Sequence, residues 1–324
     1  MTSEIKNIVQ ISTLDGAGGY KKEDLHNIEE LLSKGKPTWV HIQFLDSRDN
    51  EVFSKLNISS DFLDKLTSVR DRPRIISEGN ITFLSLRAIN FNPGSDPDDI
   101  VFLRLYSENN LIVTLRTQKV LAVQNIINSL DTGKGPRSIH ELTLTILTNI
   151  SEKISEVIYE ADDRLNEIEE KIIGDFDIKL RSELSNLRHQ IINIRRYLLP
   201  QQEVIERLSQ IICTNLTSPI LTNLKELTEK YCRYQEKIEA LRDKAAITHE
   251  ELNTIYSERL NKTMFLLSIV ATVFMPLSFI TGLLGVNVGG IPGTDSPLAF
   301  IIVTLILIII GLIEVIIFKV NKWI

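Results

Sequence analysis

The C-terminal part of the chain contains two long apolar segments that lack the charges of a soluble helix. Residues 264–284 carry no charged side chain, and residues 298–318 carry only Glu314. Each segment has 21 residues, or about 31 Å of α-helix, which matches the roughly 30 Å hydrocarbon core of a bilayer. A buried helix of a soluble protein could explain one such segment, but two in tandem predict a pair of membrane-spanning helices.

The charges beside these segments predict how the chain crosses the membrane. Two bases precede the first segment, two follow the second, and the connecting loop carries only Asp295. The positive-inside rule therefore predicts a protein of the cell (inner) membrane with both termini and residues 1–262 in the cytoplasm. The connecting loop would lie on the outer side of that membrane. The N-terminus shows no basic-then-apolar signal pattern. The four bases are Arg259, Lys262, Lys319 and Lys322.

The rest of the protein is acidic. The formal net charge of −6 belongs to residues 1–262, because two bases and two acids balance beyond them. An acidic body suits cations better than nucleic acid, and no basic patch predicts binding of DNA or RNA. Solubility alone is the alternative explanation for this charge.

No pattern of catalytic or metal-ligating residues accompanies the apolar segments. The five histidines show no zinc-ligand spacing, and Cys213 and Cys232 lack the CxxC pattern, so free thiols are expected. The loop "DGAGGY" at residues 15–20 lacks the Lys-Ser/Thr pair of a phosphate loop. We therefore expect neither an enzyme nor a tightly bound cofactor.

The N-terminal residues predict a mixed domain of strands and helices. "NIVQIST" and "TWVHIQF" alternate like strands. Hairpins are predicted around Gly79-Asn80 and Asn109-Asn110, because these residues favour tight turns between apolar runs. Short helices are expected at residues 61–69 and 119–130.

Long helices follow this domain. The first begins at Ser138, where Glu141 completes a capping box, and the second contains Pro200, which predicts a kink or break. A third runs from Pro219 through the first apolar segment, about 100 Å in all, and needs neighbours for stability. The predicted domains are an α/β cytoplasmic domain at 1–130, a helical hairpin at 131–216, a stalk helix at 217–262, membrane helices at 263–284 and 298–318, an external loop at 285–297 and a cytoplasmic tail at 319–324.

One face of the first apolar segment carries small, polar and thioether side chains. At 100° per residue they fall within a stripe about 100° wide, opposite bulky apolar residues. Close helix packing and a water-filled path both explain such a stripe. Asn261 at its inner end and Asn287 beyond its outer end favour a pore, which requires several copies in a ring. The stripe comprises Asn261, Met264, Ser268, Ala271, Met275, Ser278 and Gly282.

The stretch "NKTMFLLSIVATVFMPLSFITGLLGVNVGGIPGT" resembles the CorA superfamily of divalent-cation transporters. That superfamily is identified by a Gly-x-Asn triplet after the first of two C-terminal spans, and the triplet here is Gly285, Val286 and Asn287. The continuation "VGGIPG" is similar to the zinc-transporting ZntB branch, whereas magnesium-type members usually carry an acidic loop with Met-Pro. The dense part of the match covers residues 257–297; elsewhere only the layout agrees.

The resemblance implies a homopentamer in the membrane. Its first spans would surround the axis, its second spans would face lipid, and its stalk helices would form a funnel. Asn287 would meet a hydrated ion through its waters, while the two stripe methionines would form apolar constrictions, because thioethers are poor ligands for Mg²⁺ or Zn²⁺. Family pore positions match Asn261, Met264, Leu267, Met275, Ser278 and Asn287, and Leu267 only borders the stripe.

Three positions depart from the family pattern. Leu284 replaces an aromatic residue, Ser278 replaces a pore threonine, and the basic C-terminal cluster is reduced to Lys319 and Lys322. The gating of magnesium-type members therefore does not predict how this chain opens or closes.

Acidic residues near the candidate path allow two interpretations each. Glu236, Asp243 and Glu250 continue the stripe upstream and would line the funnel, or they form a solvated face. Asp295 would attract cations outside, or is only solvated. Glu314 would snorkel or pair near Lys319, or would couple transport to protons.

The leading hypothesis is transport of Zn²⁺, with Mg²⁺, Co²⁺, Ni²⁺ and Cd²⁺ as further candidate ions. A magnesium or cobalt channel of the same architecture is the alternative. A membrane-tethered scaffold is a third hypothesis, but a scaffold does not require the stripe. The expected partners are copies of the chain and membrane lipid.

Overall fold

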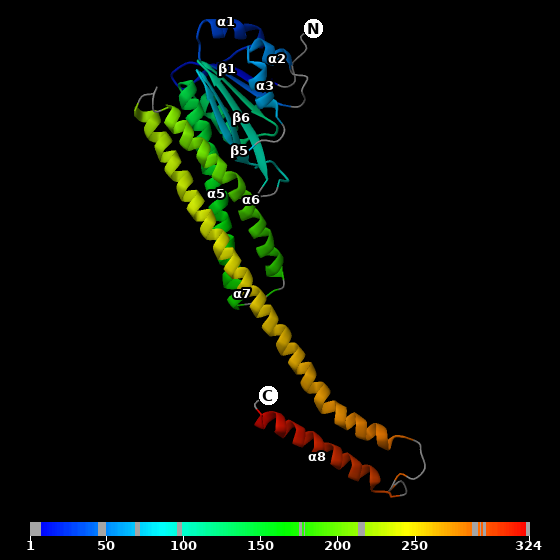
Figure 1. The fold of residues 1–324 in the computed structure, drawn as a ribbon. Coiled ribbons are helices and arrows are strands. Elements are labelled where there is room, and N and C mark those ends of the chain that lie inside the picture. The colour runs from blue at the N-terminus through cyan, green and yellow to red at the C-terminus, as the bar shows by residue number, and fades with distance from the viewer. Residues whose placement is uncertain are drawn as a thin grey trace. The chain divides into compact units, whose positions relative to one another are not determined.

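The computed structural model describes residues 8–44, 50–68, 72–95, 99–174, 177, 179–212, 218–286, 291, 293 and 296–321. The chain divides into two compact units, residues 1–249 and residues 250–324. The first unit holds a sheet with helices, and the second holds the apolar helices (Figure 1).

A mixed sheet of seven strands forms the frame of the first unit. The strand order is β2-β1-β3-β7-β6-β5-β4. Only β3 and β7 pair in parallel, and every other neighbouring pair is antiparallel. The strands are β1 Ile8–Leu14, β2 Tyr20–Lys22, β3 Thr38–Gln43, β4 Arg74–Glu78, β5 Ile81–Ile89, β6 Ile100–Glu108 and β7 Leu111–Arg116.

The two predicted hairpins are confirmed. Gly79 and Asn109 each begin a two-residue turn with positive φ, +59° and +50° respectively. Tight hairpin turns need this backbone conformation, which glycine and asparagine adopt at the lowest cost. The Asn80 Nδ2 donates to Asn109 Oδ1 at 3.2 Å, so the tips of the two hairpins lie side by side.

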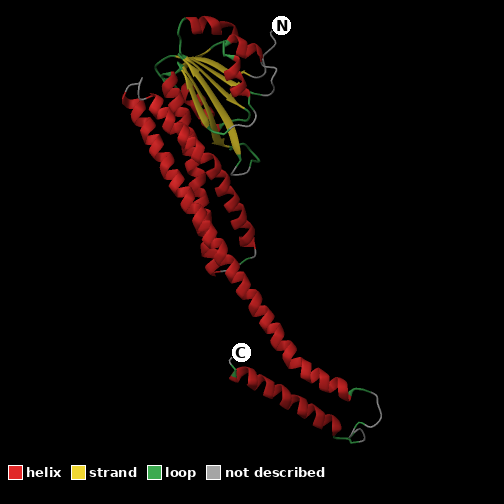
Figure 2. Ribbon diagram, viewed as in Figure 1, coloured by secondary structure: helices red, strands yellow, loops and turns green. Residues whose placement is uncertain are grey.

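Helices cover both faces of the sheet (Figure 2). The helices α1 Ile28–Ser33, α2 Asn50–Lys55 and α3 Ser60–Thr67 pack on one face, after the short 3-10 turn Leu25–Asn27. The Phe62 and Tyr106 rings meet edge-on there, with centroids 5.6 Å apart. On the other face, α5 Ile139–Gly174 and α6 Lys179–Ile212 contact β5, and α4 Leu121–Asp131 packs on α5.

The start of α5 and the middle of α6 test two sequence predictions. The Glu141 backbone N–H donates to Ser138 Oγ at 3.2 Å, which confirms the cap. The Glu141 carboxylate reaches back to the Arg137 N–H at 2.9 Å, one residue earlier than in a standard capping box. Pro200 predicts a kink or break of the helix, and a break is wrong, because α6 continues through it. Burial of its neighbours Leu198 and Gln201 outweighs the one lost backbone hydrogen bond.

Gln201 joins three elements in the interior. Its Oε1 accepts from the backbone N–H of Arg87 in β5 at 2.7 Å, and its Nε2 donates to the Tyr231 hydroxyl at 2.9 Å. The β4–β5 pairing ends where Arg74 lies opposite Ser85, so β4 does not reach Arg87. Gln201 accepts the hydrogen bond of the Arg87 amide in its place. Sequence reasoning did not identify this residue.

We expect Gln201→Leu to lower the free energy of unfolding by about 2 kcal/mol, because two buried polar partners lose their hydrogen bonds. Thermal unfolding of the full chain in detergent measures the effect. Gln202→Leu is the matched control, since Gln202 is half-buried and donates to Cys232 Sγ at 3.3 Å, a weaker acceptor than an oxygen. Equal melting temperatures for the two variants would contradict the prediction.

His41 is a second buried polar residue, on β3. Its Nδ1 lies 2.7 Å from Thr114 Oγ1, and the Trp39 Nε1 donates to the same oxygen at 2.8 Å. Thr114 Oγ1 therefore hydrogen-bonds both rings at once. Burial, and then the nearby Arg116 charge, lowers the pKa of His41 to about 3.

This low pKa makes the fold acid-sensitive. The unfolded chain takes up a proton near pH 6.5, whereas folded His41 does so only near pH 3. Above pH 6.5 the neutral His41 does not lower the free energy of unfolding. Below pH 6.5 the free energy of unfolding falls by at most about 1.4 kcal/mol per pH unit, because only the unfolded chain takes up the proton. We expect His41→Asn to show a smaller drop in melting temperature between pH 7 and pH 5 than the wild type does. Parallel curves would contradict this.

One continuous helix, α7 Ser218–Leu284, contains both the predicted stalk and the first apolar segment. It has 67 residues, or about 100 Å at 1.5 Å per residue. The second apolar segment forms α8 Ala299–Val320. Both α7 and α8 are long and apolar enough to cross a membrane, as predicted.

Candidate ion pathway

The predicted stripe lies on an exposed face of α7. Met264, Leu267 and Met275 are 64%, 64% and 71% exposed in the single chain. Apolar side chains with this exposure need lipid or another chain to cover them. The other stripe residues are exposed as well: Asn261, Ser268, Ala271, Ser278 and Gly282.

The opposite face of α7 is the less exposed one. Ile269, Val273 and Ile280 are half-buried. On α8 the less exposed residues also recur every three or four positions, and α7 and α8 are the only helices in the described part of residues 250–321. At 100° per residue, Met275 lies about 200° around α7 from Val273, so the stripe lies on the opposite side of α7 from its half-buried residues.

The three upstream acids share the exposed side of α7. Glu236, Asp243 and Glu250 follow one another at intervals of seven residues, and all three are exposed. Asp243 carries a partner, because Arg242 Nη2 lies 2.6 Å from its Oδ1. This hydrogen bond raises the pKa of Arg242, which stays charged. Part of the Asp243 charge is thereby neutralised.

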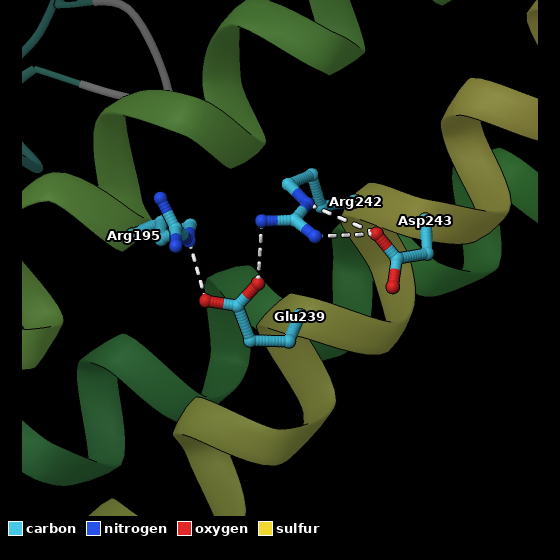
Figure 3. A network of polar contacts seen from close by, with 4 residues as sticks. All are labelled: Arg195, Glu239, Arg242 and Asp243. Carbon is cyan, nitrogen blue, oxygen red and sulfur yellow. Dashed lines mark hydrogen bonds and ion pairs between the residues drawn. The ribbon is translucent and has the colours of Figure 1, made fainter.

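Asp243 ends a chain of contacts that reaches α6 (Figure 3). Arg242 Nη1 lies 2.8 Å from one oxygen of Glu239, and the Nε of Arg195 on α6 lies 2.5 Å from the other. Glu239 therefore joins two arginines from two helices. Residue spacing along one helix does not reveal such cross-helix contacts, and sequence reasoning missed them.

Further contacts join α7 to α5. Lys237 pairs with Asp162, and Lys244 Nζ lies 2.8 Å from Glu169 Oε2. The Thr248 hydroxyl donates to the other Glu169 oxygen at 2.9 Å. Each half-exposed pair contributes about 1 kcal/mol or less, but together they fix the register of α7 against α5.

The Gly-x-Asn triplet begins where α7 ends. The Gly285 N–H donates to the Thr281 carbonyl at 2.9 Å, and a Cβ at Gly285 would lie 3.1 Å from that oxygen. Glycine therefore suits this close approach. Val286 is 49% exposed. Asn287 and Asp295 lie outside the described residues.

Glu314 lies on the less exposed face of α8. Its Oε2 is buried and has no hydrogen-bond partner among the described residues. Its neighbour one turn on, Phe318, is 5% exposed. A carboxylate in this position is costly in an apolar span, and its two interpretations, snorkelling or pairing near Lys319 and proton coupling, stay predictions.

The "DGAGGY" loop is structural. Asp15 Oδ1 accepts from the backbone N–H groups of Ala17, Gly18 and Gly19 at 2.7, 3.0 and 2.9 Å. These bonds lower the pKa of Asp15. The chain's own carboxylate thus occupies the amides that a phosphate would use.

Comparison with known proteins identifies the architecture. The family model described as "CorA-like Mg2+ transporter protein" matches residues 34–320. This chain belongs to the CorA family. CorA proteins are membrane transporters of divalent cations, so the chain is a transporter rather than an enzyme. Among the described residues, no group of three or more His, Cys, Asp or Glu side chains is arranged to hold a metal ion.

Two curated CorA relatives match along most of the chain. The zinc transport protein ZntB of Klebsiella pneumoniae is 31% identical over 309 residues, which cover 95% of this chain and 93% of the relative. The divalent cation transporter CmaX of Pseudomonas aeruginosa is 30% identical over 291 residues, 89% of this chain and 88% of the relative.

Solved structures share the full fold. The full-length CmaX structure superposes with a TM-score of 0.81 at 28% identity and covers 100% of both chains. The CorA magnesium transporter of Methanocaldococcus jannaschii gives a TM-score of 0.76 at 22% identity, with 98% of this chain and 99% of that chain covered. The mixed sheet, long helix and two apolar helices therefore form one family architecture.

Proposed function

We propose that this protein carries Zn²⁺ across the cell membrane, through the axis of a ring of five copies. The observation that carries this proposal is the stripe from Asn261 to Gly282, whose small, polar and thioether side chains are exposed and lie on the opposite side of α7 from its half-buried residues. Five such stripes around an axis enclose a path that one chain cannot form. The bulkier sides of α7 then meet α8 and neighbouring copies.

An asparagine ring suits a hydrated divalent ion. Stripping water from such an ion is very costly, and the amide oxygens of Asn287 would hold the ion through its waters. Carboxylates would bind it too tightly for release, and conduction needs binding weak enough to let the ion leave. Met264 and Met275 add apolar constrictions, because their thioethers do not hold hard cations.

The flanking charges support an orientation with both termini in the cytoplasm. In that orientation Glu236, Asp243 and Glu250 precede the pore on the cytoplasmic side. Asp243 contributes least to attracting cations, since Arg242 already pairs with it. Asp295 would be at the outer mouth.

Zinc is favoured over magnesium by the residues that follow Asn287. The "VGGIPG" segment is uncharged and resembles the ZntB branch, and the K. pneumoniae relative is named a zinc transport protein. A channel for Mg²⁺ or Co²⁺ is the second candidate, supported by the description of the family model.

Reconstitution of the full chain into proteoliposomes separates the two candidates. We expect Zn²⁺ entry, reported by an enclosed zinc-sensitive dye, to continue when equimolar Mg²⁺ is added outside. Suppression of Zn²⁺ entry by Mg²⁺, together with Mg²⁺ entry into matched vesicles, would establish the second candidate instead. Repeating the assay with a pH gradient tests proton coupling.

A further inference from the structure

A cavity of about 350 Å³ lies in the first unit, between the hairpin tips and the long helices. Its walls come from β4, β5 and β6, from α5 and the end of α6, and from the first turns of α7. It is separate from the stripe described above, which begins at Asn261.

The floor of the cavity is apolar. Leu84 and Leu105 rise from the sheet and are each 1% exposed. Leucines and isoleucines of three helices close the remaining sides. These helical residues are Leu144, Leu147, Leu208, Ile211, Ile212, Ile220 and Leu224.

The mouth of the cavity is polar but uncharged. Asn80 and Asn109, already bonded to each other, are exposed there, and Thr82, Ser107 and Thr143 are half-buried. None of the described lining residues is Asp, Glu, Lys or Arg. His140 is exposed at the mouth and is the only histidine among the described lining residues; partial burial lowers its pKa, which favours the neutral ring.

We propose that this cavity binds an uncharged amphiphile, a small molecule with an apolar body and one neutral hydrogen-bonding group, such as a medium-chain alcohol. A cavity of this size with an apolar floor and a few polar groups is the usual form of a small-molecule site. A carboxylate or ammonium group would enter without a counter-charge, which is costly. The hydroxyls and amides of the mouth can both donate to and accept from a neutral head group.

The bound molecule would contact α7 directly. Ile220 and Leu224 belong to the first two turns of the helix that continues into the first membrane segment. A bound molecule would therefore stabilise the packing of the first turns of α7 against α5 and α6. The binding itself does not depend on which ion the protein carries.

Photolabelling tests the proposal on the full chain in nanodiscs. The probe is a diazirine derivative of octan-1-ol, and mass spectrometry maps its adducts. We expect adducts on peptides that contain Leu144 or Leu208, and we expect excess octan-1-ol to remove them. A diazirine derivative of octanoic acid should label these peptides about tenfold less, because its charge is unpaired in the cavity. Equal labelling by the acid would overturn the requirement for a neutral ligand.

Variants that fill the cavity complete the test. Thr143→Phe from α5 and Ser107→Phe from β6 both narrow it, and competable adducts should disappear in each. Thr145→Phe is the matched control, because Thr145 lies on the same helix with similar burial but does not line this cavity. Melting temperatures near that of the wild type confirm folding. The proposal fails if the wild type shows no competable adduct on the lining peptides, or if adducts persist in both filled variants.

Discussion

Replacing Asn287 with alanine is expected to reduce zinc flux into proteoliposomes by about tenfold or more, which corresponds to about 1.4 kcal/mol or more of lost stabilisation at the pore mouth. In a ring of five copies the single substitution removes five amide oxygens at once. The hydrated ion then loses the amide oxygens that would bind its water shell, and the methyl group of alanine cannot replace those hydrogen bonds.

Asn321→Ala provides the control for this experiment. Asn321 follows α8 at the end of the segment opposite to Asn287 in the sequence, and its Nδ2 donates to the Ile317 carbonyl of its own helix at 3.0 Å. Flux through this variant should match the wild type. Equal flux through Asn287→Ala and the wild type, at equal protein density in the vesicles, would remove Asn287 from the pore.

Met275→Trp is expected to abolish most of the flux. The stripe faces the axis in the proposed ring, so five indole rings at one level would fill the path. We expect a loss of about tenfold or more, comparable to that of the asparagine variant. Light scattering of the purified protein checks that the ring still assembles, because a change of assembly would also lower the flux.

Leu266→Trp separates pore blockage from a general effect of size. Leu266 is 62% exposed, similar to Met275 at 71%. It lies nine residues away, or about half a turn around the helix, on the side opposite the stripe. Its flux should stay within about twofold of the wild type, because a side chain on this side of α7 does not enter the proposed path. If both variants lose flux equally while their rings assemble, the stripe does not line the path.

The sequence allows the local parts of this fold to be predicted. Gly79 and Asn109 determine their own turns, and Ser138 caps its own helix, because each acts on residues a few positions away. The apolar segments can be predicted in the same way, because a helix that crosses a bilayer needs about 20 apolar residues. The stripe on α7 required only helical spacing, and its exposure agrees with that prediction.

Contacts between distant residues could not be predicted in this way. Gln201 meets Arg87 and Tyr231 across 114 and 30 residues of chain. Glu239 finds Arg195 only because α6 and α7 pack together. The error at Pro200 has the same origin, since the burial that keeps α6 continuous comes from other elements. The uncharged cavity likewise exists only where six elements meet.

Because α7 is one continuous helix, the number of residues between the upstream acids and the stripe sets the angle between these two faces around the helix axis. The face with Glu236 and Asp243 and the face with Met275 belong to the same unbroken helix. One residue added between them would turn the face with Met275 by about 100° relative to the face with the acids, whereas seven added residues would turn it by only about 20°. Changes of length in this stretch are therefore compatible with the architecture only where the added residues make nearly whole turns, as about 7, 11 or 18 residues do.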